Sequence, residues 1–257
     1  MSNIHKTAII ANPELIPGSV TVGPYSIIED DVVIGDNIWI DSHVSIKPGA
    51  RIGHGCKIYH GAAVAGPPQD LKFAGEKTEL VLGANCTIRE YVTLNRGTIA
   101  HGKTEIGDNC LFMAYSHAAH DCIIGSNVIL ANTVEMGGHV EIGDYAILGG
   151  GTVIHQFCLI GEHSIIGGGF RITQDIIPFS MAAGYPLKCM GLNSTGLKRR
   201  GFPDEVILKL KNAFRYLLSK KLKTTEALAK IEQEIEMIPE IRRMVDFIRA
   251  SERGVVK

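Results

Sequence analysis

Apolar residues recur at every sixth position through most of the chain. Starting at His5, successive blocks of six end in isoleucine or valine, as in GPYSII, EDDVVI and GDNIWI. The same register resumes after two breaks and continues to GGGFRI, which ends at Ile172. Because side chains alternate along a strand, the fourth and sixth positions of a block point inward and the fifth points outward. The pattern therefore predicts a solenoid of short strands joined by turns.

The cysteines follow the same register. The fourth position of a block is mostly smaller than the sixth, and a small residue there suits a turn near a corner. Most cysteines occupy this position, and no two of them stand in a CxxC pair. We therefore interpret them as small buried side chains and not as zinc ligands or disulfide partners. The cysteines at the fourth position are Cys56, Cys86, Cys110, Cys122 and Cys158.

The blocks resemble the repeats of hexapeptide-repeat proteins, which form a left-handed parallel β-helix. This resemblance implies three strands per coil, hence 18 residues per coil, with coils stacked about 4.8 Å apart by backbone hydrogen bonds. We therefore expect a mainly β protein, a left-handed parallel β-helix of hexapeptide repeats followed by a C-terminal α-helical domain.

The repeat stops near Pro178, and a helical period begins after a connector that spans residues 180–202. The segment PDEVILKLKNAFRYLLSK places Pro203 at a first helical position, with acidic residues in the first turn. TTEALAKIEQEI and PEIRRMVDFIRA predict two further helices. We expect a β-helix over residues 1–190 and a helical domain over 191–257 that covers the open end of the solenoid. The apolar face of the first helix consists of Val206, Leu210, Ala213, Phe214 and Leu217.

Two breaks interrupt the repeat, at residues 65–77 and 95–103. In the first, AGPPQDLKFAGEK, Asp70 and Glu76 fall on positions that the repeat would bury, so the segment must leave the coil as a loop. The second is NRGTIAHGK. Such insertions are either tolerated surface loops or the walls of a groove, and the local sequence leaves both readings open.

The charge balance narrows the class of protein. The chain has 26 basic and 27 acidic residues, so no overall field attracts nucleic acid or an anionic membrane. No apolar run approaches the roughly 18 residues of a transmembrane helix, and the first residues do not resemble a signal peptide. We therefore expect a cytoplasmic protein with no nucleic-acid partner and no membrane span.

The segment SHAAHDC, residues 116–122, raises the question of chemistry. With a coil of 18 residues, Gly138 lies one coil above His120 and Gln156 two coils above, and His139 and His155 flank this column. Asp121 follows His120, which suits a base oriented by a carboxylate.

Gly138 could offer a backbone N–H to a developing oxyanion, as acyl transfer requires. No serine stands beside His120, so direct attack by a substrate hydroxyl is the economical mechanism. Three histidines converging on a metal between subunits remain an alternative.

Five segments extend the resemblance beyond fold: QDLKFAGE, AHDC, GGHV, VIHQFCLIG and LKRRGF, in this order. Together they resemble the acyl-carrier-protein–UDP-N-acetylglucosamine O-acyltransferases over the whole chain. The resemblance implies transfer of an (R)-3-hydroxyacyl chain from acyl carrier protein to the 3-hydroxyl of UDP-N-acetylglucosamine, the first step of lipid A synthesis. It also implies a homotrimer with sites between subunits, no cofactor and no metal.

The resemblance assigns roles to individual residues. His120 matches the general base, Asp121 its partner and Gly138 the oxyanion donor. Gly168 matches the position that ends the acyl groove, and a glycine there predicts a long-chain donor unless Phe170 shortens the groove. The residues that match substrate contacts are Asp70, Lys72, His117, His139, His155, Gln156, Asn193, Arg199 and Arg200.

The sequence departs from the family at Thr195, where the family has a glutamate, so one nucleotide contact differs. Gly168 also falls on a different face of the coil from His120, which a groove shared by two subunits explains most easily. A zinc-dependent hydratase, a non-catalytic β-helix, a related N-acyltransferase and a coenzyme A-dependent acetyltransferase are the competing readings. The donor chain length and the choice between a 3-hydroxyl and a 3-amino acceptor remain open.

Overall fold

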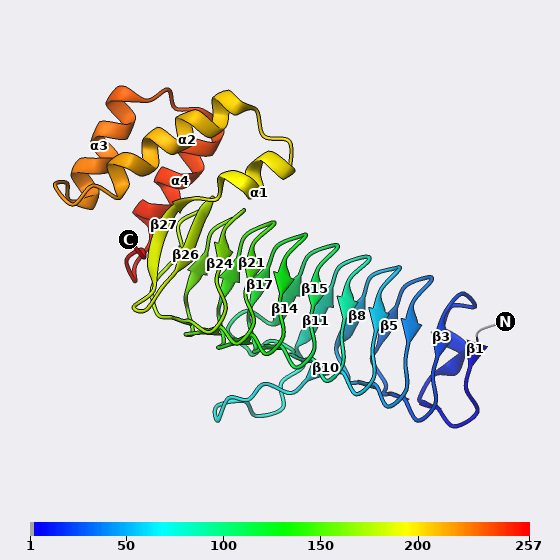
Figure 1. Ribbon diagram of the computed structural model, residues 1–257. Coiled ribbons are helices and arrows are strands. Elements are labelled where there is room, and N and C mark those ends of the chain that lie inside the picture. The colour runs from blue at the N-terminus through cyan, green and yellow to red at the C-terminus, as the bar shows by residue number, and fades with distance from the viewer. Residues whose placement is uncertain (1–2) are drawn as a thin grey trace.

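The computed structural model describes residues 3–257 and shows an elongated β-helix with helices packed at one end (Figure 1). Its short strands form three sheets, which make the three sides of the coil. We name them sheets A, B and C in the order in which the chain enters them. A 3-10 helix, η1 (Pro13–Leu15), takes the place of a strand in the first coil.

The strands of each sheet follow one another along the β-helix axis. Sheet A contains β1 (Asn3–Ile4), β3 (Thr21–Val22), β6 (Trp39–Ile40), β9 (Lys57–Ile58), β12 (Thr87–Ile88), β15 (Leu111–Phe112), β18 (Ile129–Leu130), β21 (Ile147–Leu148), β24 (Ile165–Ile166), β26 (Ser180–Ala183) and β27 (Lys188–Leu192). Sheet B contains β2 (Ile9–Ile10), β4 (Ile27–Ile28), β7 (Ser45–Ile46), β10 (Ala63–Gly66), β13 (Thr93–Asn95), β16 (His117–Ala118), β19 (Glu135–Met136), β22 (Val153–Ile154) and β25 (Arg171–Ile172). Sheet C contains β5 (Val33–Ile34), β8 (Ala50–Ile52), β11 (Glu79–Leu82), β14 (Lys103–Ile106), β17 (Ile123–Ile124), β20 (Glu141–Ile142) and β23 (Leu159–Ile160).

The pairing register follows the predicted coil length. Paired residues in adjacent coils are mostly 18 positions apart, as in Ile9 with Ile27. In all three sheets the step is longer where the paired strands span one of two insertions, as where Ala63 pairs with Thr93, Lys57 with Thr87 and Thr93 with His117. These are the two breaks in the sequence, and the coil continues in register on either side of them.

The interior of the coil is filled as the hexad pattern predicts. Cys122 and Ile124 are buried, whereas Ile123 between them is 40% exposed. All six cysteines are free and buried, which confirms their interpretation as packing residues. The core therefore runs the length of the β-helix as one apolar column.

The third residue of most blocks turns the chain at a corner in a left-handed conformation. Asp121 and His139 do so with φ of 58° and 60°. Few residues other than glycine adopt this region, although asparagine, aspartate and histidine do so more often than most. Each corner therefore holds its third residue at an edge of the β-helix.

The connector is more ordered than the sequence predicted. It contains an antiparallel hairpin, β26–β27, which pairs with β24 and so extends sheet A beyond the last coil. A short helix, α1 (Ser194–Arg199), follows the hairpin. The three predicted helices are present as α2 (Asp204–Leu217), α3 (Thr224–Glu234) and α4 (Pro239–Ala250). Pro203 precedes the first turn of α2, and Ile207 is buried on its apolar face together with most of the predicted residues, while Val206 is half-buried.

The chain end returns to the β-helix after α4. Val256 is buried and joins the β-helix core, and its N–H donates to the carbonyl of Asp175 at 2.9 Å. The Ser251 hydroxyl donates to the Asp175 carboxylate at 2.6 Å. None of the helices in residues 3–257 has both the length and the apolar character needed to cross a bilayer.

Candidate active site

The two sequence breaks lie at the same edge of the β-helix. Loop 1 (67–78) connects β10 to β11 and loop 2 (96–102) connects β13 to β14, so both pass from sheet B to sheet C. The segment with His120 passes between the same sheets one coil later. Loop 1 projects from the β-helix beside β10 (Figure 1). The insertions therefore flank the histidine column, as groove walls would.

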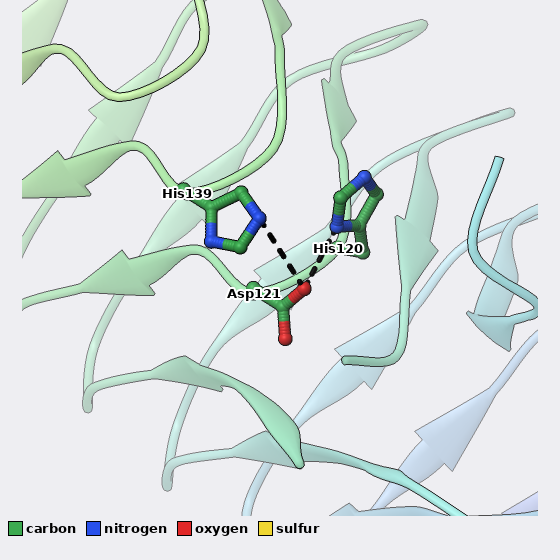
Figure 2. Close-up of side chains that lie close together, drawn as sticks. All are labelled: His120, Asp121 and His139. Carbon is green, nitrogen blue, oxygen red and sulfur yellow. Dashed lines mark hydrogen bonds and ion pairs between the residues drawn. The ribbon is translucent and has the colours of Figure 1, made fainter. Parts of the chain in front are cut away.

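His120 and Asp121 form a hydrogen-bonded pair at this edge (Figure 2). Nδ1 of His120 donates to Oδ2 of Asp121 at 2.8 Å, since a carboxylate only accepts. The side chain of Asp121 is fully buried, whereas that of His120 is 13% exposed. The bond fixes the tautomer of the imidazole and leaves Nε2 free to accept a proton.

Loop 2 holds the carboxylate of Asp121 in place. The Thr98 hydroxyl donates to Oδ2 at 2.6 Å and the Thr98 N–H donates to Oδ1 at 2.8 Å. The N–H of Asp121 donates in turn to the hydroxyl of Thr104 at 2.8 Å. Both oxygens of the buried carboxylate are thereby satisfied, as burial of a charge requires.

The same contacts set the charge of Asp121. Burial by itself raises the pKa of this carboxyl, but hydrogen bonds from the Thr98 hydroxyl, His120 and the Thr98 N–H outweigh it and hold the pKa below its usual range. Asp121 is therefore ionised at neutral pH and stabilises a protonated imidazole.

Gly138 stacks directly on the imidazole of His120, as the coil length predicts. A Cβ added at Gly138 would lie 2.6 Å from Cε1 and 2.8 Å from Nε2 of His120. The N–H of Gly138 has no acceptor within residues 3–257. At the equivalent position of another edge, the Ser126 N–H is capped by Asp144 at 2.7 Å. The Gly138 donor is thus left available beside His120.

His139 borders the pair on the side of the next coil. Its ring packs edge-on to His120, with centroids 5.3 Å apart, and stacks on Phe157 at 4.6 Å. Burial lowers the pKa of His139, although the nearby Asp121 opposes this. His139 is therefore neutral at neutral pH and can donate or accept a hydrogen bond toward a substrate.

A metal site is the competing reading of this cluster. Ligand atoms of His120, Asp121 and His139 all lie within 4.8 Å of one another. However, Nδ1 of His120 and Oδ2 of Asp121 are 2.8 Å apart, shorter than the roughly 3.4 Å between two ligands of a tetrahedral zinc ion. Oδ2 also accepts from Thr98. The geometry therefore fits a hydrogen-bonded pair better than a zinc centre.

Grooves extend from His139 in two directions. One, of about 180 Å³, lies between the two loops and is lined by Asp70 and Lys72 of loop 1 and by Thr98 of loop 2. The other, of about 590 Å³, continues past Phe157 to Arg253 in the returning chain end. Loop 1 thus brings two of the predicted substrate residues to the site.

The remaining histidines of the column have partners of their own. His117 lies on β16, where its Nδ1 is 2.7 Å from the Thr93 hydroxyl, and burial lowers its pKa. His155 lies two coils above His120, and its Nδ1 is 3.0 Å from the Gln156 carbonyl oxygen and 3.2 Å from a guanidinium nitrogen of Arg253. Gln156 occupies the corner next to His155 and is exposed.

A second set of predicted residues lies on another side of the chain. Asn193, Arg199 and Arg200 line a groove of about 330 Å³ over the outer face of sheet A, together with Thr195. The Asn193 side chain caps α1 by accepting from the Gly196 N–H at 3.1 Å. Within one chain these residues are not brought together with His120.

Gly168 and Phe170 lie between β24 and β25, at the edge that joins sheets A and B. Gly168 is exposed, and Phe170 is half-buried against the core of the last coils. The expectation that Gly168 and His120 stand on different faces thus agrees with their positions in the coil.

Sequence reasoning missed the residues that orient the pair and close the groove. Thr98 and Thr104 belong to the second break and its edge, where the interruption itself was the only signal. Phe157 and His101 occupy a corner and a loop, and both rings lie against His139. Arg253 approaches from the chain end, and no pattern in the sequence indicated its return.

The chain is similar in sequence to known proteins along its whole length. Residues 175–256 match the family model described as UDP-N-acetylglucosamine O-acyltransferase, domain 2. Residues 31–66 and 103–138 match the model of the bacterial transferase hexapeptide (six repeats). The chain is 47% identical over 258 residues to the acyl-[acyl-carrier-protein]–UDP-N-acetylglucosamine O-acyltransferase of Thermodesulfovibrio yellowstonii, with all of both chains covered.

Solved structures show the same likeness. LpxA from Acinetobacter baumannii is 41% identical, with a TM-score of 0.94 over 99% of this chain and 100% of that one. The UDP-N-acetylglucosamine acyltransferase LpxA from Bacteroides fragilis is 42% identical, with a TM-score of 0.91 over 100% and 98%. These matches confirm the expected left-handed parallel β-helix with a helical C-terminal region.

Proposed function

Since this chain belongs to the acyl-[acyl-carrier-protein]–UDP-N-acetylglucosamine O-acyltransferase family, we propose that it moves an (R)-3-hydroxyacyl chain from acyl carrier protein to the 3-hydroxyl of UDP-N-acetylglucosamine, with His120 as general base. This is the first step of lipid A synthesis. The observation that supports it best is Nε2 of His120 beside the N–H of Gly138, neither of which has a hydrogen-bond partner within residues 3–257.

The reaction requires one base and one oxyanion donor. Nε2 of His120 takes the proton of the acceptor hydroxyl, whose oxygen attacks the thioester carbonyl carbon. The Gly138 N–H donates to the oxyanion of the tetrahedral intermediate, and Asp121 stabilises the imidazolium. The carbon–sulfur bond then breaks, and the departing thiolate takes the proton from His120. No covalent acyl-enzyme is needed.

The two separated sets of residues support a site shared between subunits. His139, with Asp70 and Lys72, would contact the sugar beside His120, while Arg199 and Arg200 would bind the diphosphate from a neighbouring subunit. His117, His155, Gln156 and Asn193 complete the proposed substrate contacts. We therefore propose a homotrimer, which light scattering at micromolar concentration would reveal and a monomer would contradict.

A transfer assay tests the function itself. The purified protein is incubated with UDP-N-acetylglucosamine and an (R)-3-hydroxyacyl carrier protein, and the product is mapped by mass spectrometry. We expect one acyl group on the 3-oxygen. Acylation only of a 3-amino analogue would identify an N-acyltransferase, and equal turnover of a coenzyme A thioester would contradict the requirement for the carrier protein.

Replacing Thr98 with valine is expected to lower kcat about tenfold with little change in KM, because the carboxylate loses its 2.6 Å hydroxyl donor. The pKa of Asp121 should rise, so the fall of kcat on the acid side should begin at a higher pH. The measurement is the pH profile of kcat between about pH 4 and 8.

Serine at position 98 is the matched control, since it keeps the hydroxyl and should restore both the rate and the profile. A valine variant whose profile superimposes on that of the wild type would show that Thr98 does not act on Asp121.

Replacing Gly168 with methionine is expected to shift the donor preference toward shorter acyl chains, by about tenfold in the ratio of kcat/KM values for a long and a short donor. A Cβ at this position would lie 2.8 Å from the carbonyl oxygen of Gly150, so any side chain forces a small backbone shift. Alanine at 168 therefore serves as the control for that shift alone. Equal ratios in wild type and the methionine variant would refute the ruler role.

A further inference from the structure

His163 is a buried histidine that the proposed chemistry does not use. It lies at the corner between β23 and β24, from sheet C to sheet A, with 8% of its surface exposed. Its ring stacks between Tyr145 and Phe179, with centroids 4.8 Å and 5.7 Å away, and meets Phe202 edge-on at 5.0 Å. The imidazole is therefore the middle ring of a stack beneath α1, which we call the aromatic ladder and which consists of Tyr145, His163 and Phe179.

Two of the residues proposed to bind the nucleotide substrate, Asn193 and Arg200, contact His163. The Asn193 amide donates to the carbonyl of His163 at 3.0 Å. An N–H of Arg200 lies 3.5 Å from Nδ1 of His163, at the long limit of a hydrogen bond, and another donates to the carbonyl of Tyr145 at 2.9 Å. The guanidinium also lies over the Tyr145 ring at 5.1 Å. Arg200 is thus held against two members of the ladder, His163 and Tyr145.

The charges around His163 fix its protonation state. Burial and the guanidinium groups of Arg200 and Arg243 lower its pKa to about 4, and the carboxylate of Asp144 opposes them. Arg243 itself is paired with Glu162. Because Arg200 can only donate, Nδ1 of a neutral His163 is the acceptor and its proton resides on Nε2.

We propose that His163 is a positioning residue, whose Nδ1 accepts from Arg200 and holds that guanidinium over the groove for the diphosphate of the nucleotide substrate. The groove also contains Arg199 and Asn193, and its floor is apolar, with Ile147 and Ile165. Among residues 3–257 no acidic side chain pairs with Arg200, so the neutral imidazole orients the guanidinium without cancelling its charge. This inference rests on the proposed function.

Two variants separate the acceptor from the packing of the ring. His163→Phe keeps the stack and removes the acceptor, and the flanking ladder residues Tyr145 and Phe179 show that aromatic side chains fit this left-handed corner. His163→Asn places an oxygen near the position of Nδ1 and loses the stack, and asparagine tolerates the same backbone, as Asn127 does. The proteins are compared by KM for UDP-N-acetylglucosamine, KM for the acyl donor, kcat and thermal midpoint.

We expect His163→Phe to raise KM for UDP-N-acetylglucosamine about five- to tenfold, with kcat and the donor KM within about twofold of wild type. His163→Asn should keep a KM near that of wild type even where its thermal midpoint falls. Equal increases in both variants, or no increase in His163→Phe, would overturn the proposal, because packing alone would then account for the residue.

The variant Arg200→Ala separates a failure of this proposal from a failure of the proposed acyltransferase function. If His163 acts through Arg200, the double variant Arg200→Ala/His163→Phe should have the KM of Arg200→Ala alone. Additive effects would overturn the coupling. A wild type that does not acylate UDP-N-acetylglucosamine contradicts the proposed function, whereas an active wild type with an unchanged KM in Arg200→Ala contradicts the nucleotide role of Arg200 and with it this inference.

Discussion

Replacing His120 with alanine is expected to lower the rate of acyl transfer by about three orders of magnitude, because the acceptor hydroxyl loses its base. The loss should appear in kcat, with KM for both substrates little changed, since the side chain acts on the moving proton. Single-turnover measurements with UDP-N-acetylglucosamine and acyl carrier protein would report the chemical step directly.

The fold should survive this change. The His120 side chain is partly exposed, and Asp121 keeps both donors from Thr98 after its removal. His54→Ala is a matched control, since His54 occupies the same block position on another edge and is exposed. A residual rate within about tenfold of wild type would exclude His120 as the general base.

A double-mutant cycle of His120→Ala and Asp121→Asn examines whether His120 and Asp121 act as a unit. Asparagine tolerates the left-handed backbone at 121 and keeps an acceptor, so the change removes mainly the charge. The double variant should be no slower than His120→Ala alone, because the carboxylate acts only through the imidazole.

Replacing Gly138 with alanine is expected to lower kcat by about two to three orders of magnitude while the backbone N–H remains. The added Cβ would lie 2.6 Å from Cε1 and 3.0 Å from Nδ1 of His120, closer than van der Waals contact allows. The imidazole must therefore move away from the oxyanion donor and from Asp121. The measurement is kcat in the same transfer assay.

Gly150→Ala is the matched control for an added methyl group. Gly150 has the same block position at a different edge, where a Cβ would approach the carbonyl of Asn132 at 3.0 Å. This variant should retain activity. Unchanged activity in Gly138→Ala would contradict the stacked geometry, and a double variant with His120→Ala that is much slower than His120→Ala alone would show a role of Gly138 independent of the base.

The sequence by itself determined the β-helix and the core of the site. A strict repeat fixes which residues share a column, because each coil pairs with the next through the same backbone hydrogen bonds. Once the resemblance supplied the coil length, His120, Gly138 and Gln156 followed by counting. The inward cysteines and the apolar face of α2 were readable from side-chain periodicity for the same reason.

Only the tertiary structure decided which partners reach this column from outside the repeat. Thr98 comes from a loop and Arg253 from a chain end that crosses back after four helices, whereas Arg200 lies at another edge, against the aromatic ladder of His163. Such segments carry no periodicity, so their contacts depend on the path of the backbone and on which buried polar groups they can satisfy. The repeat places His120, and the aperiodic segments determine its orientation and the shape of the groove around it.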